Sequence, residues 1–329
     1  MEGLPLDPHH PAVRDYLHLI RLQVLTPLSL VINMATVLVC TVIAAPGIGD
    51  IASLHPTPIT PAKMPIAVYA VLIYVAQIGY CLLLVLARKP ETKQTFLKGV
   101  GFSLVFANWV VAFWAISWVM QQFLISTIFL GALLMLLLYA NMVLSIYHLP
   151  ATWKERPMDL VFIHAPLKMF LILVMNIGIE VSVFIMLHLT YPPSQPNEAM
   201  KHVFPSLLVI LSTNILSLLV IVWRQDFVWC VGAVWIDVSI WVAKWRGVGV
   251  WIPALAFTVL HPVALVASAL YLRLRKPKQP IALPPDDEEQ VRCTPLIIIT
   301  ISCVADYGIR CVGCGCACPP AETCRGSYC

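Results

Sequence analysis

Long apolar runs separated by short polar gaps make up most of the chain. Eight runs have membrane-spanning length, at about residues 25–45, 65–87, 99–119, 124–146, 166–190, 203–223, 227–245 and 250–272. A helix of about 20 apolar residues crosses a bilayer, and the runs lack the alternation of half-buried strands. Because backbone in lipid must satisfy its own hydrogen bonds, the pattern predicts an all-α integral membrane protein with eight transmembrane helices.

The composition agrees with this pattern. Hydrophobic residues make up 60% of the 329 residues, charged residues make up 12%, and the mean hydropathy is +0.84. An ordinary soluble domain is excluded, because there is too little polar surface to cover such a core. The net charge of +4 is spread over the gaps between the runs rather than gathered in one patch. We therefore expect membrane lipids as partners and no nucleic acid.

Lys and Arg residues favour alternate gaps. The N-terminal segment and the gaps near residues 88–98, 154–156, 224 and 273–278 carry most of them. The intervening gaps hold Lys63, Lys201, Lys244 and Arg246. The positive-inside bias then puts both termini in the cytosol, which an even number of spans allows. We divide the chain into a cytosolic N-terminal tail (1–24), a transmembrane domain (25–272) and a cytosolic, disordered, Cys-rich tail (273–329).

The C-terminal tail holds most of the cysteines. Eight of the 11 fall between Cys293 and Cys329, after the polar linker KPKQPIALPPDDEEQ. A single C-x-x-C pair, Cys311 and Cys314, is a weak signal without a second pair or a histidine, so we assign no metal site. The alternatives for this tail are lipid attachment, metal binding, or a segment without a selected function.

Two acidic residues, Glu180 and Asp237, lie inside apolar runs. A charged residue at the bilayer centre costs roughly 2.5 to 3.5 kcal/mol on insertion scales. Each acid is therefore expected to be neutral or to bond a partner such as His261, Asn176 or Asn214. Asn176 precedes Glu180 by four residues and shares its helical face. Two inward acids predict an internal polar cavity, which either pairs helices or binds a ligand, a proton or an ion.

The third run contains an amide, Asn108, and two indoles, Trp109 and Trp114. An amide in hydrocarbon commonly bonds a neighbouring helix, and an indole at this depth serves either bundle packing or the lining of a ligand cavity. We add these three residues to the polar residues of the later runs as candidates for a ligand site. The candidate ligand-binding residues are Asn176, Glu180, Asp237, His261, Asn108, Trp109 and Trp114.

Four stretches carry a resemblance to a known family. They are ITPAKMPIAVYAVLIY (59–74), FANWVVAFWAISW (106–118), the Leu-rich fourth run, and HAPLKMFLILVMNIGIEV (164–181). In this order they resemble the tryptophan-rich sensory protein family, which includes the translocator protein (peripheral benzodiazepine receptor) and larger multi-span relatives. The resemblance covers about residues 25–190. It implies a translocator-like bundle of the first five helices, and a cavity near the Pro-rich outer loop that binds a bulky apolar molecule such as a tetrapyrrole or sterol.

The expected role is binding or moving a small hydrophobic molecule. One alternative is a proton-coupled secondary transporter that uses Glu180 and Asp237, and another is a non-catalytic membrane adaptor whose polar residues only hold helices together. The sequence contains no G-x-S-x-G, H-E-x-x-H or Walker motif and no G-x-G-x-x-G after a strand, which are the patterns of common catalytic sites. We therefore expect no enzyme activity and no cofactor.

Overall fold

The computed structural model describes residues 11–147, 157–192, 194, 196–243 and 248–275, and these residues form helices and no strand. Residues 276–329 of the predicted Cys-rich tail, Lys244, Arg246 and residues 1–10 lie outside the described residues. The α-helices are α1 (Pro11–Leu38), α2 (Ile48–Leu54), α3 (Lys63–Leu86), α4 (Pro90–Gln94), α5 (Ser103–Val119), α6 (Phe123–Tyr147), α7 (Pro157–Asp159), α8 (Ala165–Leu173), α9 (Ile179–Met186), α10 (Val203–Arg224), α11 (Phe227–Trp241) and α12 (Val248–Arg275). Four π-helical segments, η1 (Val39–Ile43), η2 (Thr95–Val100), η3 (Leu160–His164) and η4 (Val174–Gly178), and one 3₁₀ segment, η5 (Pro196–His202), join them.

Each of the eight predicted runs falls on a helix, so the all-α membrane architecture is confirmed. Six helices in the described part of the chain are long and apolar enough to cross a membrane, or seven if the pair Pro90–Val100 and Ser103–Val119, bent by 47°, is one span. The two shorter helices are α5 with 17 residues and α11 with 15. The count of eight spans therefore stays a prediction. The first helix begins at Pro11, so residues 11–24 of the predicted tail belong to it.

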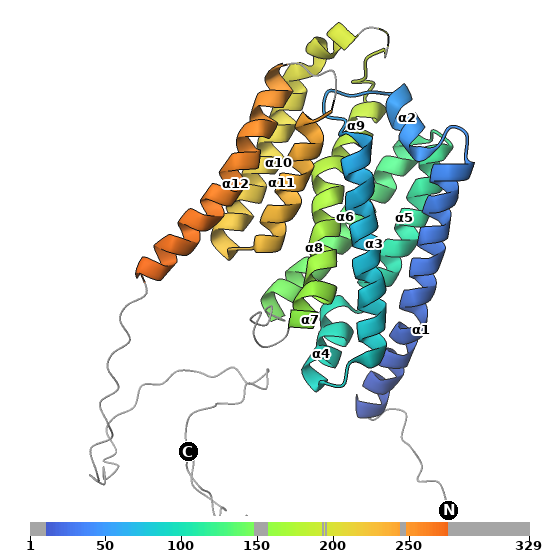
Figure 1. Cartoon of the computed structure of the whole chain (residues 1–329). Coiled ribbons are helices and arrows are strands. Elements are labelled where there is room, and N and C mark those ends of the chain that lie inside the picture. The colour runs from blue at the N-terminus through green and yellow to red at the C-terminus, as the bar shows by residue number, and fades with distance from the viewer. Residues whose placement is uncertain (1–10, 148–156, 193, 195, 244–247, 276–329) are drawn as a thin grey trace, which may run out of the picture. The chain divides into compact units, whose positions relative to one another are not determined.

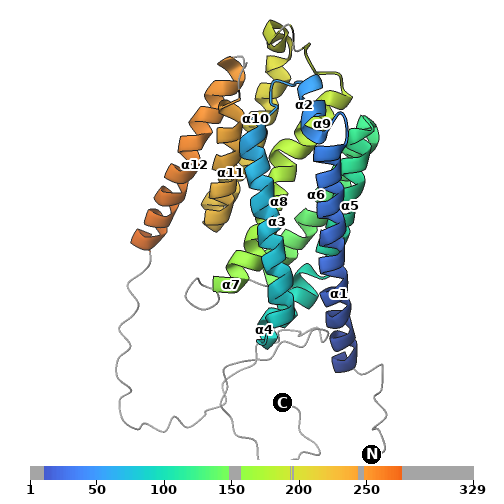
Figure 2. The ribbon, with the colours of Figure 1, turned by 45° about the vertical axis from the view of Figure 1, so that its right-hand side comes forward.

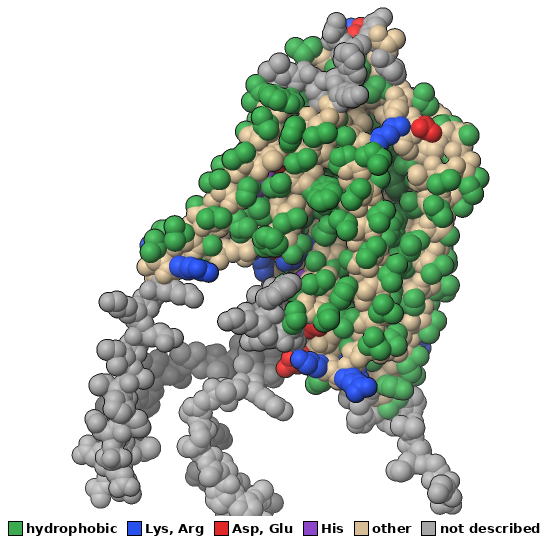
Figure 3. Space-filling view, viewed as in Figure 1, with side chains coloured by type: hydrophobic (Ala, Val, Ile, Leu, Met, Phe, Trp, Pro, Cys, Tyr) green, Lys and Arg blue, Asp and Glu red, His purple; other side chains and the backbone are tan. Residues whose placement is uncertain are grey.

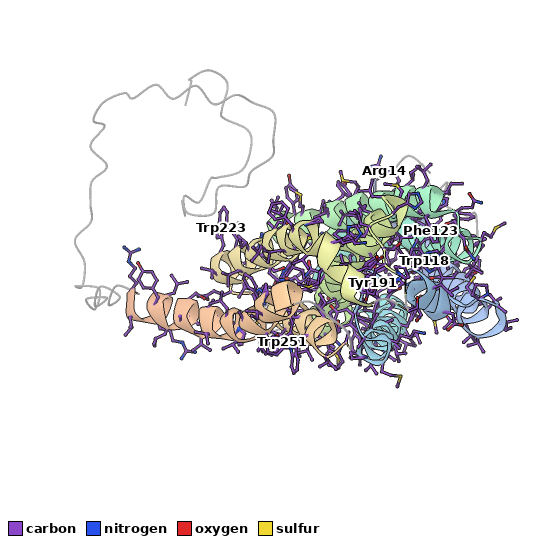
Figure 4. All side chains as sticks on the ribbon, turned by 90° about the horizontal axis from the view of Figure 1, so that it is seen from above. Arg14, Trp118, Phe123, Tyr191, Trp223 and Trp251 are labelled. Carbon is purple, nitrogen blue, oxygen red and sulfur yellow. The ribbon has the colours of Figure 1, made fainter. Side chains whose placement is uncertain are left out.

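The helices pack side by side with their axes roughly parallel, as Figures 1 and 2 show. α1 contacts α3 and α5, α5 contacts α6, and α6 contacts α8 and α9. α10, α11 and α12 contact one another, and α11 also contacts α3 and α8. Seen from above, α12 lies at one edge and α1 at the opposite edge, with the other helices between them (Figure 4). The contacts of α11 with α3 and α8 are thus the main connection between the last three helices and the rest of the bundle.

The stretch Pro157–Met186, which we call the central helix, is the most enclosed span. Its apolar window is 61% buried, whereas the windows of the other five spans are 22–28% buried. Large hydrophobic side chains on the outer helices are exposed, as expected of surfaces that face lipid. The space-filling view in Figure 3 shows a hydrophobic surface along the helices, with Lys and Arg side chains at their two ends.

The central helix is interrupted twice, by η3 and by η4. A π-helical turn replaces the usual i to i−4 hydrogen bonds and is frequent at functional sites. The second interruption contains Asn176, and Glu180 follows in the first turn of α9. The directions in which the side chains of Asn176 and Glu180 point therefore depend on this irregular turn.

Gly79 of α3 is a point of close approach to the central helix. A Cβ atom on Gly79 would lie 2.1 Å from a ring carbon of Phe162, and small residues commonly allow such approaches between membrane helices. We expect Gly79→Ala to lower the free energy of unfolding by about 1 to 3 kcal/mol, because the Phe162 ring must shift to make room. Thermal unfolding in detergent, followed by far-UV circular dichroism, measures this change.

Gly131→Ala in α6 is the matched control, since nothing lies within 4 Å of the added Cβ atom. It removes the same backbone freedom from a helix without crowding a neighbour, so its stability should match or slightly exceed that of the wild type. Equal unfolding temperatures for the two variants would contradict this packing of α3 on the central helix.

Candidate functional site

The two acids of the apolar runs are both buried. The side chain of Glu180 in α9 is 8% exposed and that of Asp237 in α11 is 1% exposed. Asp237 lies ten residues after Phe227, the first residue of α11, which places it about 15 Å along the helix axis. Because both residues are buried, neither acid faces lipid. This agrees with the high cost of a carboxyl group in hydrocarbon.

Asp237 lies beside a fully buried histidine of α12. The Oδ2 atom of Asp237 is 3.3 Å from Nδ1 of His261, a distance within the range of ion pairs but without the alignment of a hydrogen bond. On the other side of the ring, Nε2 is 3.3 Å from the backbone carbonyl oxygen of Asn214 in α10. The amide side chain of Asn214 also lies within hydrogen-bonding reach of Asp237. The histidine thus connects α10, α11 and α12.

The carbonyl oxygen of Asn214 fixes one hydrogen on His261. A carbonyl oxygen can only accept, so Nε2 must carry a hydrogen in order to bond to Asn214. Nδ1 then faces the Asp237 carboxyl group, at 3.3 Å. A histidine beside a buried carboxyl group is a partner that lowers the cost of burying it.

Glu180 approaches the same group of residues from the central helix. Its carboxyl group interacts electrostatically with Asp237 and lies within hydrogen-bonding reach of the Thr213 hydroxyl in α10. The Thr213 hydroxyl also donates to the carbonyl oxygen of Val209, at 3.0 Å. Its oxygen is then available to accept a hydrogen from a protonated Glu180. The π-helical turn η4 before Glu180 contacts both α10 and α11, which explains how the carboxyl group reaches these helices.

Several polar atoms of this group have no hydrogen-bond partner among the described residues. They are Oδ1 of Asn176, Oε1 of Glu180 and Oδ1 of Asn214, together with the facing atoms Oδ2 of Asp237 and Nδ1 of His261. The first three are oxygens of carboxyl or amide groups, which accept hydrogen bonds. We call Asn176, Glu180, Thr213, Asn214, Asp237 and His261 the polar cluster. Buried polar atoms are normally paired, so the unpaired acceptors mark this cluster as the candidate functional site.

A protein-family model described as TSPO-like protein matches residues 22–272. The chain belongs to the TSPO-like protein family. The resemblance to the translocator-like family noted from the sequence is thereby confirmed, and the match extends over α10, α11 and α12, which hold four residues of the polar cluster. No curated protein and no solved structure gives a significant match.

The candidate residues of the third run lie elsewhere in this TSPO-like protein. Asn108 of α5 accepts a hydrogen bond from the side-chain amide of Asn33 in α1, at 2.8 Å. The hydroxyl of Tyr74 in α3 donates to Asn33, at 3.3 Å. These three groups join α1, α3 and α5 in the manner of interhelical hydrogen bonds in other membrane proteins. The structure therefore does not bring Asn108 to the polar cluster.

The two indoles of α5 are likewise outside the polar cluster. Trp109 is 37% exposed and stacks on Phe113, with ring centroids 6.1 Å apart. Trp114 packs against Trp118 of the same helix, with ring centroids 6.0 Å apart. Trp118 and Phe123 pack edge to face near the turn between α5 and α6, and both are labelled in Figure 4. The structure therefore does not bring Trp109 or Trp114 to the polar cluster.

Sequence reasoning missed a second buried pair of charges in the TSPO-like domain. Lys168 of α8 donates a short hydrogen bond to Asp226, and both side chains are largely buried. Asp226 also caps α11 by accepting from the backbone N–H of Trp229, at 3.1 Å. The sequence signals were a lysine at the third position of the apolar run 166–190 and an acid directly before the apolar run 227–245. This pair ties the central helix to the start of α11.

Proposed function

We propose that this TSPO-like protein binds or moves a small hydrophobic molecule, of a tetrapyrrole- or sterol-like class, and that the polar cluster holds the polar end of that molecule. The observation that carries the proposal is the set of unpaired acceptor oxygens at Asn176, Glu180 and Asn214, buried where η4 of the central helix packs against α10 and α11. Binding sites for small apolar molecules typically combine an apolar wall with a few polar groups that fix orientation. The apolar helices around the cluster supply such a wall.

The proposed topology has eight spans, with the first five helices as a translocator-like bundle and both termini in the cytosol. The contacts of α1, α3, α5, α6 and the central helix support the bundle. The packing of α11 among α3, α8 and α12 supports a short span. The opposite end carries fewer Lys and Arg residues, among them Lys63 and Lys201, and this asymmetry supports the cytosolic termini.

A second candidate function is proton-coupled secondary transport that uses Glu180 and Asp237. The contact of Asp237 with His261 favours it, because a buried carboxyl group 3.3 Å from an imidazole places two proton-binding groups side by side. A third candidate is a membrane adaptor, in which the polar cluster only joins helices. None of the three requires catalysis or a cofactor, and we propose a non-enzymatic protein whose only constant partners are membrane lipids.

Binding of cholesterol and protoporphyrin IX to the protein in lipid nanodiscs tests the proposed function. We expect saturable binding of at least one of the two. Glu180→Gln should keep most of that affinity, within about threefold, since an amide has nearly the size of a neutral carboxyl group and changes little contact area. A transporter would instead lose pH-dependent uptake in proteoliposomes with this substitution. An adaptor would show neither binding nor uptake, and that result would overturn the proposal.

A further inference from the structure

Four of the five unpaired atoms of the polar cluster are oxygens of carboxyl or amide groups. Oδ1 of Asn176, Oε1 of Glu180 and Oδ1 of Asn214 are buried without a hydrogen-bond partner in the described part of the chain, and so are Oδ2 of Asp237 and Nδ1 of His261, which face each other. The Asn214 side-chain N–H group, by contrast, already donates to the carbonyl oxygen of Ile210, at 3.0 Å. A molecule that satisfies this site must therefore donate hydrogen bonds rather than accept them.

The charge of the site leads to the same conclusion. Asp237 has His261 beside it, at 3.3 Å, whereas no basic side chain pairs with Glu180 among the described residues. No other charged side chain lies on α9, α10 before Arg224, or α6, which packs against α9. Lys168, twelve residues before Glu180 on the central helix, is engaged by Asp226. An ionised Glu180 thus needs a cation that the surrounding helices do not supply.

Glu180 has two ways to avoid an unbalanced charge. Without a ligand, its carboxyl group holds a proton, because an isolated carboxylate in an apolar interior is costly. With a cationic ligand, the carboxylate forms a charge-assisted hydrogen bond to it, which is roughly twice as strong as a neutral one. The proton and the cation therefore compete for the two carboxyl oxygens of Glu180.

We propose that the ligand of this site is a hydrophobic amine, which binds as its ammonium form and displaces the proton of Glu180 into water. The exchange is balanced: the neutral carboxyl group loses one proton, and the resulting carboxylate bonds the N–H groups of the ammonium ion. Asn176 and Asn214 accept the other N–H groups. This inference rests on the proposed function, and it specifies the polar end of the molecule that the site accepts.

Three probes with the same hydrocarbon cage test the inference: 1-aminoadamantane, 1-adamantanol and 1-adamantanecarboxylic acid. We expect the amine to bind to the protein in nanodiscs about tenfold or more tightly than the alcohol, and the acid to bind weakest. Titration calorimetry in two buffers of different ionisation enthalpy should show release of about one proton per amine bound, and none for the alcohol.

Glu180→Gln separates the charge from the shape of the site. It should lower the affinity for the amine by about tenfold or more and leave that for the alcohol within about threefold. Glu198→Gln is the matched control, since Glu198 pairs with the exposed Lys201 outside the cluster, and it should change neither affinity. If the Glu180 variant cannot be purified folded, the proton release of the wild-type protein decides the question.

The outcomes distinguish this inference from the proposed function. Equal affinity for the amine and the alcohol, or amine binding without proton release, would overturn the inference and leave the proposed function standing. Absence of saturable binding for all three probes, together with cholesterol and protoporphyrin IX, would overturn both.

Discussion

Lys168→Met is expected to lower the free energy of unfolding by about 3 to 5 kcal/mol, the usual cost of removing one partner from a buried ion pair. The reason is that Asp226 would be left buried and charged at the start of α11, with only the Trp229 backbone N–H as a partner. Denaturation in detergent, followed by far-UV circular dichroism, measures the change. The yield of folded protein after purification should fall with it.

Two further variants make this expectation specific. Lys201→Met removes a lysine from the exposed pair with Glu198 and should cost less than about 1 kcal/mol. The double variant Lys168→Met, Asp226→Asn removes both charges but keeps an N-cap side chain for α11, and should recover most of the lost stability. If Lys168→Met is no more destabilising than Lys201→Met, the buried pair does not tie the central helix to α11.

His261→Leu is expected to lower the free energy of unfolding by about 2 to 5 kcal/mol, because two buried groups lose their partner at once. One is the Asp237 carboxyl group, 3.3 Å from the ring, and the other is the carbonyl oxygen of Asn214, also 3.3 Å away. The loss should appear as a lower midpoint in thermal or denaturant unfolding of the detergent-solubilised protein.

The double variant Asp237→Leu, His261→Leu serves as the comparison. It replaces the pair by apolar side chains, and its loss of stability should be clearly smaller than the sum for Asp237→Leu and His261→Leu alone. Additive losses would mean that Asp237 and His261 do not interact, and the polar cluster would then lose its link between α11 and α12.

The sequence predicted the helices well, because apolar runs of spanning length leave few other structures possible in lipid. Every predicted run lies on a helix, and the family resemblance drawn from residues 25–190 is confirmed over residues 22–272. The helix ends were harder to predict. Residues 1–24 precede the first apolar run and were predicted as a tail, yet α1 begins at Pro11.

The burial of Glu180 and Asp237 also follows from elementary energetics, since a carboxyl group in hydrocarbon is costly on any scale. The choice of partner does not follow. His261, Asn176 and Asn214 were all candidate partners of the two acids, and the rotation of α10, α11 and α12 about their axes selects His261 and Asn214 for Asp237. Such rotations depend on packing between segments far apart in the sequence.

Three features gave little warning in the sequence. Trp109 lies on α5, a helix that is apolar on all sides, so no polar face indicated which way the indole points. The structure leaves it 37% exposed. Lys168 and Asp226 are 58 residues apart, and only the tertiary contact of α8 with α11 brings them together. No residue pattern in the sequence predicted the π-helical turn η4, which orients Asn176 and Glu180.

The claim on which this account depends is that Glu180 and Asp237 share one buried polar site. Infrared spectroscopy of the protein in nanodiscs tests it, by way of the C=O stretch of the protonated Glu180 carboxyl group, identified as the band lost in Glu180→Gln. We predict that Asp237→Asn shifts this band, and that Asp50→Asn, at the exposed pair with Lys63, leaves it in place. A Glu180 band that is the same in Asp237→Asn and in the wild type would contradict the account.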